Sequence, residues 1–86
     1  MNAEQAIAQL SNALTLASQH EFDKEAIRAL TKDIVDEKHY HYIEQGLSTN
    51  DKSLLMHGII GALSHYEAEK EKEHFQKRIR SIADHH

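Results

Sequence analysis

The sequence predicts an all-α protein, a small three-helix bundle or helical hairpin with a long C-terminal helix. The 86-residue chain contains no proline and only three glycines, so most of the residues that interrupt helices are missing. Its apolar residues recur at intervals of three and four, which is the spacing of one helical face. The length fits one domain, and we expect residues 1–86 to form a single helical unit.

Composition narrows the classes of function. The absence of cysteine excludes disulfide bridges, cysteine-ligated zinc and a thiol nucleophile. The net charge of −4 disfavours nucleic acid as a partner, because nucleic-acid binders usually carry a basic excess. No apolar run approaches the roughly 18–20 residues of a membrane span, and no segment resembles a signal peptide. We therefore expect a cytoplasmic protein without a membrane partner.

The first helix is expected at residues 3–19. Asn2 is a good N-cap, and Gln5, three residues later, completes a capping box. The apolar face consists of Ala3, Ala6, Ile7, Leu10, Ala13, Leu14 and Ala17. The opposite face is polar but almost uncharged, which fits either a contact surface or a tolerant exposed face.

The second helix is expected at residues 24–45. Asp23 is its natural N-cap, and Gly46 followed by apolar Leu47 resembles a Schellman stop. The apolar stripe changes face towards the end of this segment. The helix is therefore either covered on both faces there or distorted around residues 36–42.

The third helix is expected at residues 50–83. Ser48 and Asp51 fit a capping box, and Asn50 is an alternative cap. No stop signal follows before the chain ends, so this helix is much longer than the other two. A compact three-helix bundle does not accommodate a third helix of this length. We therefore expect the C-terminal half of the third helix to project from the bundle or to cross onto a second subunit.

A heptad seam runs along the third helix, because one line of residues recurs in alternating steps of four and three. Its members are Leu54, Gly58, Gly61, His65, Ala68, Lys72, Phe75, Ile79 and Ile82. Glycine costs about 1 kcal/mol against alanine inside a helix, so Gly58 and Gly61 predict a close helix crossing; the alternative is a kink or break. We expect this seam to form a homodimer or partner interface.

The eight histidines raise the question of a metal or pH-sensitive site. Asp36 with His39, and Glu71 with His74, have the spacing of an acid–histidine ligand pair, but chance provides about as many pairs. No serine-nucleophile motif or phosphate-binding glycine loop occurs. We therefore predict no metal site, no cofactor and no catalytic residues.

The tyrosines and histidines of the second and third helices remain as candidate contact residues. Tyr40 and Tyr42 alternate with histidines at residues 39–42, which is typical of either a partner contact or a half-buried aromatic end of the bundle. His57 and His65 fall in the part of the third helix expected to be enclosed. His65, on the seam, either fixes register or senses pH, or it is a core-edge residue hydrogen-bonded to a neighbour.

These observations predict a small non-enzymatic protein-interaction or regulatory module, such as an adaptor, an inhibitor or a chaperone-like protein, acting as a homodimer. One alternative is a dimeric nucleic-acid-binding regulator that uses the basic cluster Lys77, Arg78 and Arg80, although the helix dipole alone favours basic residues there. A second alternative is a helical protein that binds metal through histidine and carboxylate groups.

Overall fold

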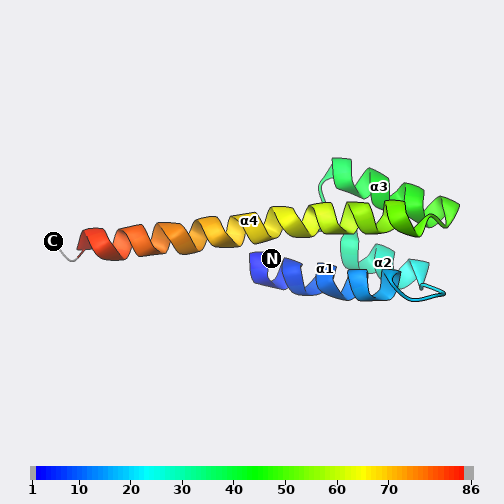
Figure 1. The fold of residues 1–86 in the computed structure, drawn as a ribbon, viewed down its shortest axis with the longest axis horizontal. Helices are drawn as coiled ribbons and strands as arrows, with labels where there is room; N and C mark the ends of the chain where they lie inside the picture. Colours follow the sequence, from blue (N-terminus) through cyan, green and yellow to red (C-terminus); the bar gives the residue numbers. More distant parts are fainter. Residues whose placement is uncertain (1, 85–86) are drawn as a thin grey trace.

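The computed structural model describes residues 2–84, of which the last four are described as backbone only. Within this range the chain forms helices and no strand, which confirms the all-α prediction (Figure 1). The helices are α1 (Ala3–Ala17), α2 (Lys24–Thr31), α3 (Glu37–Thr49) and α4 (Lys52–Asp84). The prediction of three helices is wrong, because the segment expected as one helix at residues 24–45 forms two.

Helix α4 determines the shape of the molecule. Its 33 residues span about 50 Å, and the whole structure measures 57 × 20 × 19 Å. α1 and α3 pack on different sides of its N-terminal half, and α2 packs on α1 (Figure 1). The C-terminal half of α4 extends beyond these helices.

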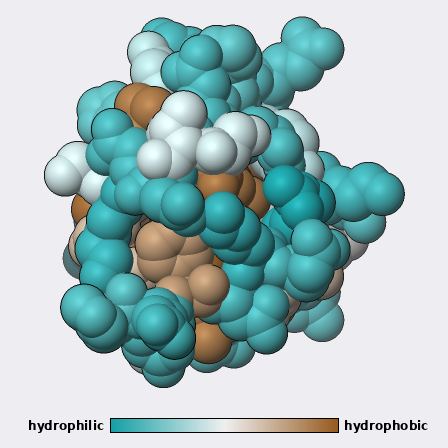
Figure 2. Space-filling model, turned by 90° about the vertical axis from the view of Figure 1, so that its right-hand side faces the viewer, coloured by the Kyte–Doolittle hydropathy of each residue, from teal (hydrophilic) through white to brown (hydrophobic). Residues whose placement is uncertain are grey.

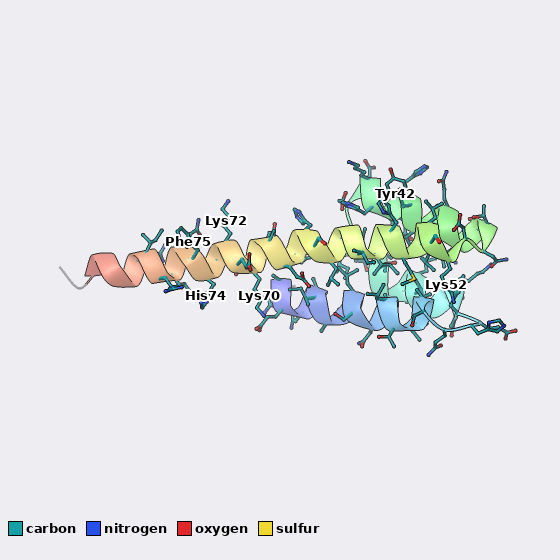
Figure 3. The ribbon with its side chains drawn as sticks, in the orientation of Figure 1. Tyr42, Lys52, Lys70, Lys72, His74 and Phe75 are labelled. Carbon is teal, nitrogen blue, oxygen red and sulfur yellow. The ribbon has the colours of Figure 1, made fainter. Side chains whose placement is uncertain are left out.

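The start of α1 follows the sequence prediction. Asn2 Oδ1 accepts a hydrogen bond from the backbone N–H of Gln5 at 2.9 Å, and Gln5 Oε1 accepts one from the N–H of Asn2. The helix ends two residues earlier than expected. Lys52, at the start of α4, donates hydrogen bonds from Nζ to the carbonyl oxygens of Ser18 and Gln19 (Figure 3), so a cation satisfies carbonyls just beyond the C-terminus of α1.

A break at residues 32–36 separates α2 from α3 and corrects the predicted helix at 24–45. Asp36 is the N-cap of α3, since its carboxylate accepts from the backbone N–H of His39. The change of apolar face in the sequence has its cause here. The break allows Ile27 before it, Ile34 within it and Ile43 beyond it all to be buried in one core.

The expected Schellman stop at Gly46 is also wrong. α3 continues to Thr49, and Asn50 adopts the left-handed conformation with φ 55° and ψ 33°, which its short polar side chain tolerates. Gly46 lies inside the helix and its carbonyl accepts from the N–H of Asp51 at 3.0 Å. Close packing against α4, and not a turn, requires glycine at this position.

α4 begins at Lys52, two residues later than predicted. Asp51 alone caps it, by accepting from the N–H of Leu54 at 3.1 Å, so neither a Ser48–Asp51 capping box nor an Asn50 cap forms. The helix is continuous through both glycines and runs straight in Figure 1, so neither the break nor the kink occurs. A Cβ on Gly58 would lie 2.8 Å from Ile43 Cγ1 and 2.9 Å from the carbonyl oxygen of His39. The predicted close helix crossing is therefore confirmed.

The core lies between α1, α2, α3 and the first third of α4. Its buried apolar residues are Ala6, Leu10, Ala13, Ala17, Ile27, Ile34, Ile43, Leu47, Leu55, Ile59 and Ala62. Figure 2, which views the end of the molecule opposite the projecting segment, shows hydrophilic side chains around much of this end with apolar ones visible between them. In residues 2–84 no helix is both long and apolar enough to cross a membrane.

Candidate interaction surface

The structure divides the predicted seam into a covered and an uncovered half. Over residues 54–61 it is packed: Gly58 is buried, and Leu54 and Gly61 are half-buried. From His65 onwards the seam residues are exposed, with Phe75 at 62% and Ile79 at 51%. The remaining predicted seam residue, Ile82, lies outside the residues whose side chains are described.

α3 is the element that covers the first half. Ile43 lies against Gly58, and the ring of His39 lies against Gly61. His39 is in the first turn of α3, so the N-terminal end of α3 lies beside Gly61 and α3 does not cover α4 beyond this level. Lys72 and Phe75 lie on the side of α4 on which α3 packs (Figure 3). The uncovered half of the seam is thus the continuation of the α3-binding face.

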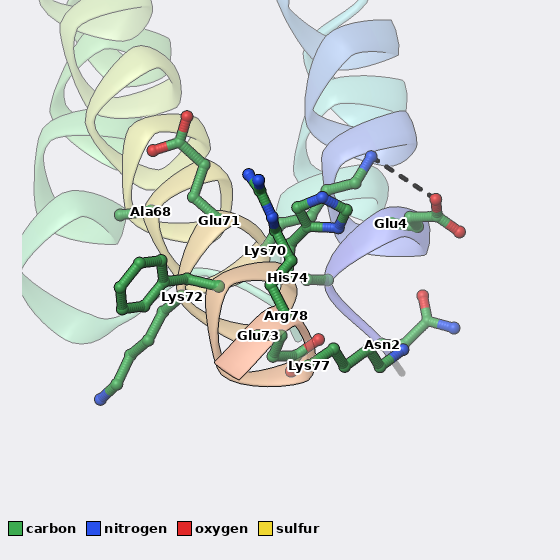
Figure 4. A pocket seen from close by; sticks show the side chains of 12 residues that line it. Asn2, Glu4, Ala68, Lys70, Glu71, Lys72, Glu73, His74, Lys77 and Arg78 are labelled. Carbon is green, nitrogen blue, oxygen red and sulfur yellow. Dashed lines mark ion pairs between the residues drawn. The ribbon is translucent and has the colours of Figure 1, made fainter. Parts of the chain in front are cut away.

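On the other side of α4, the bundle extends as far as the N-terminal end of α1. Lys70 Nζ lies 3.5 Å from Glu4 Oε1, and both side chains are more than half exposed (Figure 4). His74 projects to this same side (Figure 3). All side chains from residue 67 to residue 80 are exposed, so the bundle buries none of this segment.

An open hollow lies beside the N-terminal end of α1, at the level where α4 extends beyond the bundle. It is lined by Asn2, Ala3, Glu4, Ala68, Lys70, Glu71, Lys72, Glu73, His74, Phe75, Lys77 and Arg78. Figure 4 shows the α4 side chains pointing in different directions beside Asn2 and Glu4 at the start of α1, and they do not enclose a volume. The hollow therefore fits contact with another helix better than enclosure of a small ligand.

The projecting segment of α4 carries its charges in two blocks. Residues 67–73 contain four glutamates and two lysines, whereas residues 74–80 contain three basic residues and no acidic one. Glu71 and Arg78 each directly precede a seam residue, so both flank the seam on the same edge. In the described part of the chain neither forms an intramolecular ion pair. Flanking the heptad seam is the signal that could have identified them from sequence.

Tyr40 and Tyr42 belong to the bundle and not to the projecting surface. The Tyr40 hydroxyl donates to Glu44 Oε1 at 3.0 Å, and Arg28 Nε donates to the same oxygen at 2.9 Å. Burial raises the pKa of Tyr40, while the hydrogen bond from Arg28 lowers the pKa of Glu44. The Tyr42 ring lies edge-on to His57 with centroids 5.2 Å apart, far along α4 from Phe75 (Figure 3). Both tyrosines are half-buried, Tyr40 on the side of α3 that faces α2 and Tyr42 on the side that faces α4.

The histidines do not gather into one site. His39 Nδ1 lies 2.6 Å from Asp36 Oδ1, and this hydrogen bond lowers the pKa of the Asp36 carboxyl. The expectation that His57 and His65 are enclosed is wrong: both are exposed, and His65 Nε2 lies 3.3 Å from Glu69 Oε1. Over the described residues no group of three or more potential ligands is close enough to hold a metal ion.

Comparison with known proteins adds no relative. No family model matches the sequence, and no curated protein and no solved structure matches it significantly.

Proposed function

We propose that this protein is a small non-enzymatic interaction module that acts through the projecting half of α4, and that it does so as a homodimer. The observation that carries the proposal is the exposure of Phe75 and Ile79 on the continuation of a face that α3 already covers. The two residues are four apart, so their side chains are neighbours on one side of the helix. Together they form an apolar strip that a second helix can bury.

Helix stability supports the same conclusion. Most helical stability in proteins comes from packing of an apolar face, and isolated helices shorter than about 12–15 residues are marginal in water. The segment beyond Glu67 is only slightly longer, with 17 residues, and its side chains are exposed up to residue 80. A partner helix on the seam would supply the missing packing.

The composition of the seam predicts reversible association. Full burial of an Ile or Phe side chain contributes about 1.5–3 kcal/mol, and the exposed half of the seam offers few such residues. His65 and Lys72 occupy the seam positions on either side of Ala68 and keep polar groups at the contact. These features favour a partner that binds and dissociates, as regulatory and adaptor interactions do.

Sedimentation of matched variants tests the proposal. The wild-type chain should be largely dimeric at about 50 µM. Phe75→Gln with Ile79→Gln should give a monomer, because both apolar contacts are lost. His74→Gln with Lys77→Gln, changed off the seam on the same segment, should behave as wild type. A wild-type monomer, or a dimer unaffected by the seam substitutions, would contradict the proposal.

The exposed basic residues at 77, 78 and 80 favour nucleic acid as a second candidate partner. The glutamates of residues 67–73 on the same helix oppose it, because they repel phosphate. Retention on heparin at low salt that weakens steeply as salt rises would support the candidate. Failure to bind at low salt would eliminate it.

A further inference from the structure

We infer that the occupant of the exposed seam is a second copy of this chain in antiparallel orientation, with Glu71 of each copy paired to Arg78 of the partner subunit. The inference rests on the proposed function, since it assigns a partner to the same surface. Two independent features, the extent of the uncovered seam and the order of charges along it, lead to the same register.

The first feature is length. The seam is exposed from His65 to Ile79, and the heptad spacing continues it to residue 82, about 26 Å along the helix from His65. An antiparallel copy covers all of it when residue 82 of one chain lies level with residue 65 of the other. The two-fold axis then passes between residues 73 and 74. In this register the C-terminal end of the partner's α4 lies close to Gly61, where the first turn of α3 packs, so it extends the coverage that α3 provides.

The bundle itself opposes a parallel pair. α3 occupies the seam face over residues 54–61, and a parallel copy would bring a second bundle with its own α3 to the same level. Two bundles 20 × 19 Å in cross-section cannot lie side by side at the close helix spacing, about 8–10 Å, that seam contact requires. An antiparallel pair places them at opposite ends.

The second feature is charge. With the axis between residues 73 and 74, the acidic block 67–73 of each chain lies beside the basic block 74–80 of the other. Residues that precede the same heptad position on two antiparallel helices meet across the seam. Glu71 therefore meets Arg78 of the partner subunit, and two-fold symmetry forms this pair twice.

A different antiparallel register or a parallel orientation does not pair Glu71 with Arg78 of the partner subunit. Moving the antiparallel copy by one heptad brings Arg78 beside Arg78 of the partner subunit. A parallel pair places Lys72 on Lys72 of the partner subunit and sets Glu71 opposite an uncharged glutamine. Like charges brought together weaken association. The charge order thus selects the register that the length of the seam also selects.

The seam residues are complementary in this register. Ala68 lies opposite Ile79 of the partner subunit, so a small residue faces a large one, as in well-packed cores. Lys72 lies opposite Phe75 of the partner subunit. Its methylene chain can cover the ring while its ammonium group reaches solvent or the ring face.

Charge exchange tests the orientation. Glu71→Arg should weaken dimerisation about tenfold or more, as should Arg78→Glu, because each creates two like-charge contacts. The double variant Glu71→Arg/Arg78→Glu should return the dissociation constant to within about threefold of wild type. Glu73→Arg and Arg80→Glu are the matched controls: they have the same residue types and spacing but lie away from the seam, and should change affinity by less than about threefold.

The outcomes separate this inference from the proposed function. Single variants without effect, or a double variant that fails to recover, would overturn the antiparallel pairing even if Phe75→Gln with Ile79→Gln still abolishes the dimer. A wild-type chain that stays monomeric would overturn both. All four charged positions are exposed, so circular dichroism should show unchanged folding of α1–α3 in each variant.

Discussion

A Cβ atom on Gly46 would lie 2.6 Å from the backbone nitrogen of Leu55, closer than side-chain carbons approach other atoms. α3 and α4 therefore meet backbone to backbone near the turn that joins them. The two helices diverge little from this point to Gly58, where Ile43 and the His39 carbonyl occupy the space of a side chain. Glycine is needed here for the approach of a second helix, although it weakens an isolated helix.

The loss of stability on replacing a glycine of α3 or α4 by alanine should depend on which atoms surround that glycine. At Gly46 the obstacle is backbone, which cannot turn aside. Gly46→Ala should therefore lower the free energy of unfolding by about 2 kcal/mol, because overpacking exceeds the gain in helix propensity. At Gly61 the obstacle is the His39 ring, which can rotate, so Gly61→Ala should stay within about 1 kcal/mol of wild type. Urea titrations measure both, and equal losses would contradict this ranking.

A hydroxyl on α4 secures the turn between α2 and α3. The Tyr66 hydroxyl donates to the carbonyl oxygen of Ile34 at 2.5 Å. Tyr66→Phe leaves that part-buried carbonyl without its partner and should cost about 1 kcal/mol of unfolding free energy. Tyr42→Phe is the control, because the Tyr42 hydroxyl has no hydrogen bond within residues 2–84. Equal stability of both variants and the wild type would show that the Tyr66 bond is not formed.

Acid should weaken the protein partly through Glu44. Arg28 lowers the pKa of Glu44 in the folded state, so the folded state holds this proton less tightly than the unfolded chain does. The contribution is complete above the ordinary pKa of glutamate and is lost as pH falls below it and through the lowered pKa of the folded state. Glu44→Gln should remove that part of the decline. Because the pair is about one-third exposed, the difference should be about 1 kcal/mol or less.

Denaturation of wild type and Glu44→Gln at pH 7 and pH 3 measures this effect. The stability advantage of the wild type should be larger at pH 7. Asp36, whose pKa is lowered by His39, titrates in the same direction in both proteins and cancels in the comparison. An advantage that is equal at both pH values would contradict the role of Glu44.

The sequence predicted the start of a helix correctly where a single capping residue determines it. Asn2 and Asp23 cap the helices expected of them, and the long helix appears within two residues of its predicted start. The errors fall at Asp36 and Gly46. An aspartate is compatible with a helix interior and with a cap, and a glycine with a stop and with a close crossing. Only contacts with distant residues, such as Leu55, decide between these roles.

The candidate surface was predictable in part for the same reason. Heptad periodicity identified the seam, including Phe75 and Ile79, because spacing along one helix is a local property. Which half of it is uncovered depends on where α3 begins, and so on the break that ends at Asp36. The exposure of His57 and His65 followed from that tertiary arrangement and not from their apolar neighbours in sequence.

The distance between two spin labels tests the antiparallel dimer most directly. The chain has no cysteine, so Ile60→Cys supplies one attachment site, at a side chain that is 46% exposed. With the two-fold axis between residues 73 and 74, the labels in a dimer should be about 40 Å apart, given the 1.5 Å rise per residue. A double electron–electron resonance distribution centred near that distance supports the account. A distribution centred below about 25 Å, as side-by-side helices would give, or no dipolar signal at dimer-forming concentration, would contradict it.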